Sequence, residues 1–126
     1  MDRYDPSQAP DPEAWLALDE QERLDLAVEY HRRARIKLPN VKVHAVMHAA
    51  VENQLASNDE PVIRAFGRVM KQGLSRHDAI HAIGSILAAY IFNALKLNGS
   101  AETLRAEYYA AIERLTADEW LNSNDG

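Results

Sequence analysis

Helix-capping residues recur along this chain and divide it into short segments with helical patterning. Asp11, Asp19, Asn40, Ser75 and Ser100 each stand directly before such a segment, where their side chains can accept hydrogen bonds from the free amides of a first helical turn. Apolar residues within the segments recur every three or four positions, and no run alternates with period two for long enough to indicate a strand. The sequence therefore predicts an all-α protein.

The expected helices occupy residues 12–18, 19–36, 41–56, 61–73, 75–97 and 100–115, with a last turn at 116–121. Leu38-Pro39 and Asn98-Gly99 are expected to interrupt the helical segments. Short connections favour antiparallel neighbours, so we expect an up-down bundle of four to five helices, with stacked helical hairpins as the alternative. We expect a single helical domain at 12–121, a polar arm at 1–11 that is frayed or becomes ordered late, and a tail at 122–126.

Composition excludes several classes of site and partner. The 126 residues include no cysteine, which rules out disulfides, iron–sulfur ligation, cysteine zinc sites and thiol nucleophiles. A formal net charge of −5 makes nucleic acid and anionic membranes unfavourable partners. The longest segment without a charged residue, 79–95, is shorter than the roughly 20 apolar residues that span a bilayer. Because the first residues also lack the apolar run of a secretory signal, we expect a cytoplasmic protein.

Four of the five histidines form two His-x3-His pairs, His44 with His48 and His77 with His81. This spacing places both imidazoles of a pair on one helix face, about 6 Å apart at Cβ, where they can bind one metal ion. Each pair falls in the first two turns of its expected helix. In an up-down bundle these two helices run parallel, so we expect both pairs at the same end of the bundle, with His31 nearby.

Two carboxylates accompany the histidine pairs. Glu52 continues the His44 and His48 face by one turn, and Asp78 precedes His81 by three residues. Such a set suits Zn, Fe, Mn, Ni or Cu better than Ca or Mg, and we expect no organic cofactor. Carboxylate-bridged di-iron bundles use Glu-x-x-His on two helices, a motif that this chain lacks. The sequence therefore predicts a divalent transition-metal-binding bundle, with metal-assisted hydrolysis as its reaction if it is an enzyme. The expected metal-site residues are His44, His48, His77 and His81 as ligands, with Glu52 and Asp78 as oxygen ligands or as carboxylates that support the histidines.

A non-catalytic structural or protein-interaction module is the alternative. Histidines on apolar helices are often packed side chains that bond to backbone carbonyls or to neighbouring carboxylates. In that case, apolar side chains left on the surface, such as Tyr90, Ile91 and Phe92, would contact a protein partner or a second copy in a homodimer. The sequence identifies no catalytic residue, because it lacks the Gly-x-Ser-x-Gly, His-Glu-x-x-His and phosphate-binding glycine motifs.

The two segments that carry the histidine pairs resemble a family of small bacterial all-helical proteins of unknown function. The resemblance rests on HAVMHAAVENQLA and LSRHDAIHAIGSILA, which are separated by an apolar helix that ends at Gly73. Trp15 and Tyr30-His31 also fit, so the resemblance covers most of the chain. It implies a compact helical domain and directs attention to both His-x3-His pairs, without implying a reaction.

A weaker resemblance concerns Arg76 and His81. The segment Arg76-His77-Asp78-Ala79-Ile80-His81 is similar to the Arg-x4-His motif of the HEPN-type ribonucleases, in which an arginine and a histidine act at a dimer interface without metal. That resemblance implies acid/base catalysis by His81 and phosphate stabilisation by Arg76. It leaves His44 and His48 without a role.

Overall fold

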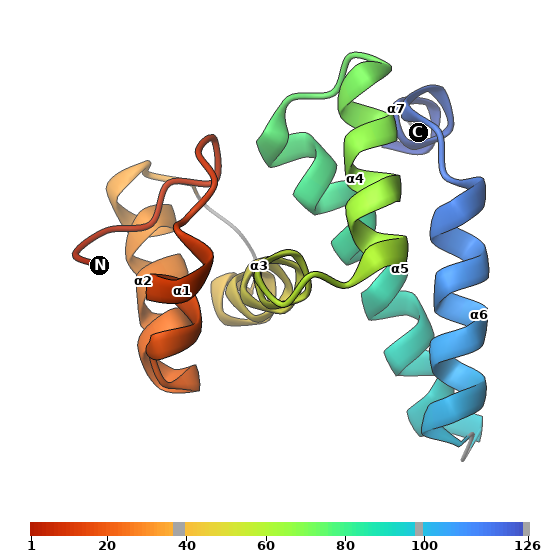
Figure 1. Ribbon diagram of the computed structural model, residues 1–126, viewed down its shortest axis with the longest axis horizontal. Helices are drawn as coiled ribbons and strands as arrows, with labels where there is room; N and C mark the ends of the chain where they lie inside the picture. The colour runs from red at the N-terminus through yellow and green to blue at the C-terminus, as the bar shows by residue number, and fades with distance from the viewer. Residues whose placement is uncertain (37–39, 98–99, 125–126) are drawn as a thin grey trace.

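The computed structural model describes residues 1–36, 40–97 and 100–124, and no strand occurs in these ranges. Within them the chain forms helices α1 (Pro12–Ala17), α2 (Glu20–Arg33), α3 (Val41–Ala56), α4 (Glu60–Lys71), α5 (Arg76–Leu97), α6 (Ala101–Arg114) and α7 (Ala117–Asn124). The predicted all-α fold is confirmed, and the helices pack against one another as a bundle (Figure 1). The interruptions predicted at Leu38-Pro39 and Asn98-Gly99 lie outside the described residues.

Side-chain caps begin the helices at the residues that the sequence predicts. A capping box from Asp19 opens α2. Asn40 accepts a hydrogen bond from the Val43 amide at the start of α3, over 3.1 Å, and Ser75 accepts one from the Asp78 amide at the start of α5, also over 3.1 Å. The last two caps bear on function, because α3 and α5 each carry a histidine pair in their first two turns.

Three of the described helices end near a left-handed residue: Arg35 follows α2, Asn58 follows α3 and Gly73 follows α4. α2 ends at Arg33, earlier than predicted, because Arg35 adopts a φ of 56° and the Ile36 amide turns back to donate to the His31 carbonyl over 3.1 Å. Gly73 has a φ of 113°, which favours glycine, and it stops α4 as predicted. The early end of α2 leaves His31 in the last turn of that helix.

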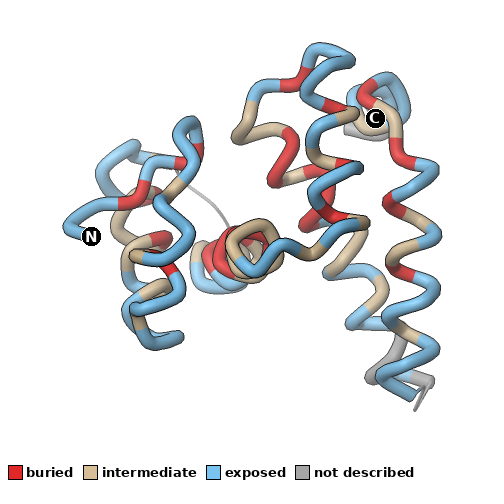
Figure 2. The backbone as a smooth tube through the Cα atoms, in the orientation of Figure 1, coloured by how far each residue is buried: buried red, intermediate tan, exposed pale blue. Residues whose placement is uncertain are grey.

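α3 lies between two groups of helices. Figure 1 views it nearly along its axis, whereas α4, α5 and α6 run across the view. It packs against α1 and α2 on one side and against α4 and α5 on the other. Ala45 and Ala49 join an apolar cluster with Tyr4 and Trp15, and Val51 joins the larger cluster formed by α4, α5 and α6. Helix α3 thus buries residues on both sides (Figure 2), and it crosses α5 instead of running parallel to it as expected.

The N-terminal arm is packed against the helices and is not frayed in this structure. Tyr4 and Pro6 are buried, and the ring of Tyr4 lies 5.6 Å from that of Trp15. Arg33 donates a hydrogen bond to the Tyr4 carbonyl over 3.1 Å, and Arg76 donates one to the Pro6 carbonyl over 2.9 Å. One buried aromatic ring and two arginine contacts therefore hold a segment whose composition is mostly polar.

The C-terminal helix extends past the boundary expected at Leu121. The Glu119 amide donates to the Thr116 hydroxyl over 3.1 Å at the start of α7, which then continues to Asn124. The remainder of the expected tail, 125–126, lies outside the described residues. Among the described helices, none has the length and apolar character needed to cross a membrane.

Candidate metal centre

All five histidines come together between α2, α3 and α5. The residues are His31 on α2, His44 and His48 on α3, and His77 and His81 on α5. Neighbouring rings have centroid separations between 4.4 and 5.0 Å. The ring of His48 is central, because it contacts the rings of the other four histidines. The structure thus brings together the four histidines predicted as ligands and adds His31 to them.

Several imidazole nitrogens in this cluster approach one another as metal ligands do. Nε2 of His81 lies 2.9 Å from Nε2 of His44 and 3.0 Å from Nε2 of His48. One ring nitrogen from each of His31, His44, His48 and His77 lies within 4.8 Å of the other three. Bonds of about 2.0–2.1 Å to a shared ion place adjacent nitrogens about 2.8–3.4 Å apart, for octahedral to tetrahedral angles. The contacts of His81 already have this spacing.

Hydrogen bonds fix the tautomer of His48. The Tyr4 hydroxyl donates its one proton to the Glu52 carboxylate over 2.6 Å. Its oxygen also lies 3.1 Å from Nδ1 of His48, so Nδ1 must carry the proton of that second hydrogen bond. Burial and then the charge of Glu52 raise the pKa of Tyr4, which keeps the hydroxyl protonated. Nε2 of His48 therefore presents a lone pair to the cluster.

Two nitrogens of the cluster are buried without a hydrogen-bond partner. In the part of the chain that the structure describes, Nε2 of His31 and Nε2 of His77 are the buried side-chain polar atoms left unpaired. Nδ1 of His31 donates to the Ala27 carbonyl over 2.7 Å, so its Nε2 also carries a lone pair. Leaving a buried acceptor unpaired costs about 1–3 kcal/mol, a penalty that a bound cation would remove.

Hydrogen bonds between the rings do not satisfy both of the close nitrogen contacts that His81 makes. Because Nε2 of His48 has no proton, its 3.0 Å contact requires a proton on Nε2 of His81. That same proton would also have to serve Nε2 of His44 at 2.9 Å. A metal ion would instead interact favourably with a lone pair from each of the three rings.

Burial favours the neutral, metal-binding form of His44, His48, His77 and His81. Burial, together with the charges of neighbouring histidines, lowers the pKa of His44 to about 4 and that of His81 to about 3. The pKa of His48 is also strongly lowered, first by burial and then by the other four histidines. Burial lowers the pKa of His77 as well, although the carboxylate of Asp78 partly opposes this shift.

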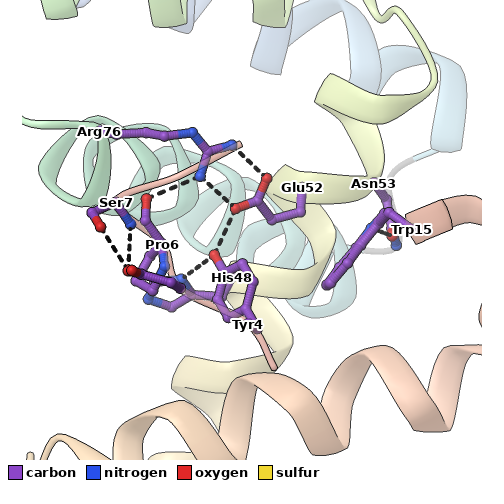
Figure 3. A network of polar contacts seen from close by, with 9 residues as sticks. Tyr4, Pro6, Ser7, Trp15, His48, Glu52, Asn53 and Arg76 are labelled. Atoms are coloured by element: carbon purple, nitrogen blue, oxygen red, sulfur yellow. Dashed lines mark hydrogen bonds and ion pairs between the residues drawn. The ribbon is translucent and has the colours of Figure 1, made fainter. Parts of the chain in front are cut away.

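A polar network supports His48 on its Nδ1 side (Figure 3). Arg76 forms two hydrogen bonds with the Glu52 carboxylate, over 2.7 and 2.8 Å, and their side chains are only 10% and 1% exposed. Glu52 accepts from Tyr4, and Tyr4 accepts from His48. Such a chain holds the imidazole in one orientation and one tautomer, as partners behind metal ligands commonly do.

The two carboxylates predicted as ligands or as supporting groups lie outside the converging nitrogens. Within the described residues, that converging group contains histidines and no carboxylate. The oxygens of Glu52 are engaged by Arg76 and Tyr4, so Glu52 lies behind His48. Asp78 is close enough to influence His77 electrostatically, and its backbone amide donates to the Ser75 hydroxyl that caps α5.

The sequence did not single out Tyr4 as part of this site, and it connected Arg76 only with phosphate. The one available signal for Tyr4 was an aromatic residue in an otherwise polar arm. Arg76 stands next to His77, but its partner Glu52 lies on a different helix. Both residues are recognised only after α3, α5 and the arm are placed together.

Comparisons with models of known protein families, with curated proteins and with solved structures find no match to this chain. The resemblances to the bacterial helical family and to the HEPN-type ribonucleases therefore stay predictions. The geometry of the histidine cluster is the basis on which function is inferred.

The metal-free protein is expected to lose stability as the pH falls below 6.5, the ordinary pKa of histidine. Because the pKa values of His44 and His81 are lowered in the fold, to about 4 and about 3, the unfolded chain binds more protons in this range. The urea midpoint, measured after dialysis against EDTA, should therefore decline steadily between about pH 6.5 and pH 4. A constant midpoint over this range would contradict the neutral, buried state of the cluster.

Proposed function

We propose that this protein binds a divalent transition-metal ion through its histidine cluster. The observation that carries the proposal is the pair of unpaired buried nitrogens, Nε2 of His31 and Nε2 of His77. Their residues, His31 and His77, both belong to the group whose ligand atoms converge, together with His48. Histidines that serve only to pack a core are expected to pair such atoms with carbonyls or carboxylates.

The proposed ligands are imidazole nitrogens of His31, His44, His48 and His77, with His81 in contact with two of them. Imidazole suits Zn, Cu, Fe and Ni, whereas Mn prefers oxygen ligands. The lack of a carboxylate in the converging group therefore favours the first four metals. Among them we take zinc as the first ion to test.

Hydrolysis receives less support than binding. A metal-bound water needs a group that accepts its proton, and Glu52 is the buried carboxylate nearest in the network. Its two oxygens already accept hydrogen bonds from Arg76 and Tyr4. Glu52 would have to break a buried ion pair to act as a base, so we propose a metal-binding function without assigning a reaction.

The ribonuclease alternative also receives little support from the geometry. An arginine that stabilises phosphate must present its guanidinium to the substrate. The guanidinium of Arg76 is instead bonded to Glu52 and to the Pro6 carbonyl, and its side chain is mostly buried. His81 faces other histidines in the cluster.

The test is a titration of untagged, EDTA-treated protein with Zn²⁺ and Co²⁺, combined with elemental analysis. We expect about one equivalent to bind and to stabilise the fold by about 2.7 kcal/mol when the free ion is at 100 times its Kd. The matched variant is His31→Leu, which replaces an unpaired buried nitrogen by apolar atoms and should leave the metal-free fold intact. Its zinc affinity should fall at least about tenfold.

Two results would overturn the proposal. One is less than about a tenth of an equivalent of either metal bound by folded wild-type protein. The other is zinc binding that is unchanged in folded His31→Leu, because the ion would then lie elsewhere.

A further inference from the structure

An open groove of about 590 Å³ lies between α3 and α5, directly beside the histidine cluster. Asn40 and His44 are its polar lining residues, and among the described residues no charged side chain lines it. The other lining residues are apolar, and Val43 and Phe92 among them are 60% and 64% exposed. Its volume is within the roughly 300–1,000 Å³ typical of sites for small organic molecules.

His44 belongs both to the groove and to the cluster. It lines the groove, while its Nε2 lies 2.9 Å from Nε2 of His81. On α5, the stripe that carries His77 and His81 continues through Gly84, Ala88 and Ile91, which line the groove. His31 and His48 are fully buried, whereas His44 is partly exposed. The groove is therefore a route by which a ligand from solvent can reach the cluster.

The groove depends on the close approach of α3 and α5 at one glycine. A Cβ atom at Gly84 would overlap the side chain of Met47. Glycine therefore lets Met47 lie against α5, where both residues line the groove. Methionine is flexible and adapts its shape to apolar ligands, so this contact gives the groove an adjustable apolar wall.

The charges around the cluster indicate what kind of group would approach the metal. Neutral histidines add no negative charge, and the carboxylate of Glu52 is already balanced by Arg76. A divalent ion held there would keep its positive charge in a partly dehydrated site, which favours an anionic ligand. Because no described lysine or arginine lines the groove, the proposed metal is the cation there that would recognise the anion.

We propose that the groove binds a carboxylate with an unbranched apolar chain, its chain along α3 and α5 and its carboxylate at the metal held by the histidine cluster. The inference rests on the metal site proposed above. The ligand is thus a medium-chain carboxylate, and the metal ion binds its carboxylate group directly.

Decanoate is the probe, and its binding is measured by calorimetry with zinc-loaded and with EDTA-treated protein. We expect zinc to tighten decanoate binding at least about tenfold. The attraction between the metal ion and the carboxylate is stronger in a partly dehydrated site than between the same two charges in water. Butyrate should bind more weakly than decanoate, because each CH₂ that is buried contributes about 0.8 kcal/mol. Decylamine has a similar chain without the anion, and zinc should not strengthen its binding.

A pair of tryptophan variants tests the location. Ala88 is exposed and lines the groove, whereas its neighbour Ala89 is exposed and does not line it. Ala88→Trp should weaken decanoate binding at least about tenfold by filling the groove, while zinc binding stays at the wild-type value. Ala89→Trp should leave the binding of both decanoate and zinc unchanged.

The outcomes separate this inference from the metal site. Zinc binding without decanoate binding overturns the inference and leaves the metal site intact, whereas failure of zinc to bind removes both. Decanoate binding that is equal in the two tryptophan variants places the ligand elsewhere and overturns the inference. A wild-type dimer in sedimentation that dissociates in Ala88→Trp, with no decanoate binding, shows a second copy in the groove and also overturns it.

Discussion

Replacing His48 with glutamine is expected to lower zinc affinity by at least about 100-fold, the largest loss from any single substitution in the cluster. Loss of a group behind a ligand commonly costs 10- to 100-fold, and His48 is a proposed ligand itself. Its ring contacts those of the other four histidines, at 4.9 to 5.0 Å. It is fully buried, and Tyr4 fixes its lone pair toward the cluster.

The measurement is a competition titration of zinc against a chelator of known affinity. His44→Gln is the comparison, because His44 is at the partly exposed edge of the cluster and its loss should cost less. Glutamine is similar to histidine in size and can keep a hydrogen bond to Tyr4, so the variant is expected to fold. A folded His48→Gln protein that binds zinc within about threefold of wild type would exclude His48 as a ligand.

The helices were predictable because their signals are local. The caps at Asp19, Asn40 and Ser75 and the stop at Gly73 each act within a few residues, and all four occur as expected. The crossing of α3 and α5 was not predictable, because it depends on how side chains fit between the helices. The contact between Gly84 and Met47 is one such fit, and sequence spacing alone does not reveal it.

In the candidate site, too, the local features were predictable from the sequence and the contacts between distant residues were not. The pairing of His44 with His48 follows from a spacing of four residues, which any helix converts into neighbours. The bond between Tyr4 and His48 joins residues 44 positions apart, and the bond between Arg76 and the Pro6 carbonyl joins residues 70 positions apart. A polar arm that contains prolines indicates disorder by composition, so only the tertiary fold shows that Tyr4 closes the cluster.

Arg76→Met is expected to destabilise the fold by about 3–5 kcal/mol, because it leaves the buried carboxylate of Glu52 without its cation. The matched control is Arg64→Met, which breaks an ion pair of 2.9 Å with Glu113 on the surface, where both side chains are 55% exposed. Exposed pairs of this kind contribute about 0–1 kcal/mol. Urea denaturation of the two variants at neutral pH should therefore separate them clearly.

The double variant Arg76→Met with Glu52→Gln identifies the cause of that loss. Glutamine is neutral and its carbonyl can still accept the proton of Tyr4, so the double variant should recover most of the stability lost in Arg76→Met. Recovery would show that an unpaired buried charge, rather than lost packing, destabilises the single variant. If Arg76→Met costs no more than Arg64→Met, the buried ion pair contributes little to stability.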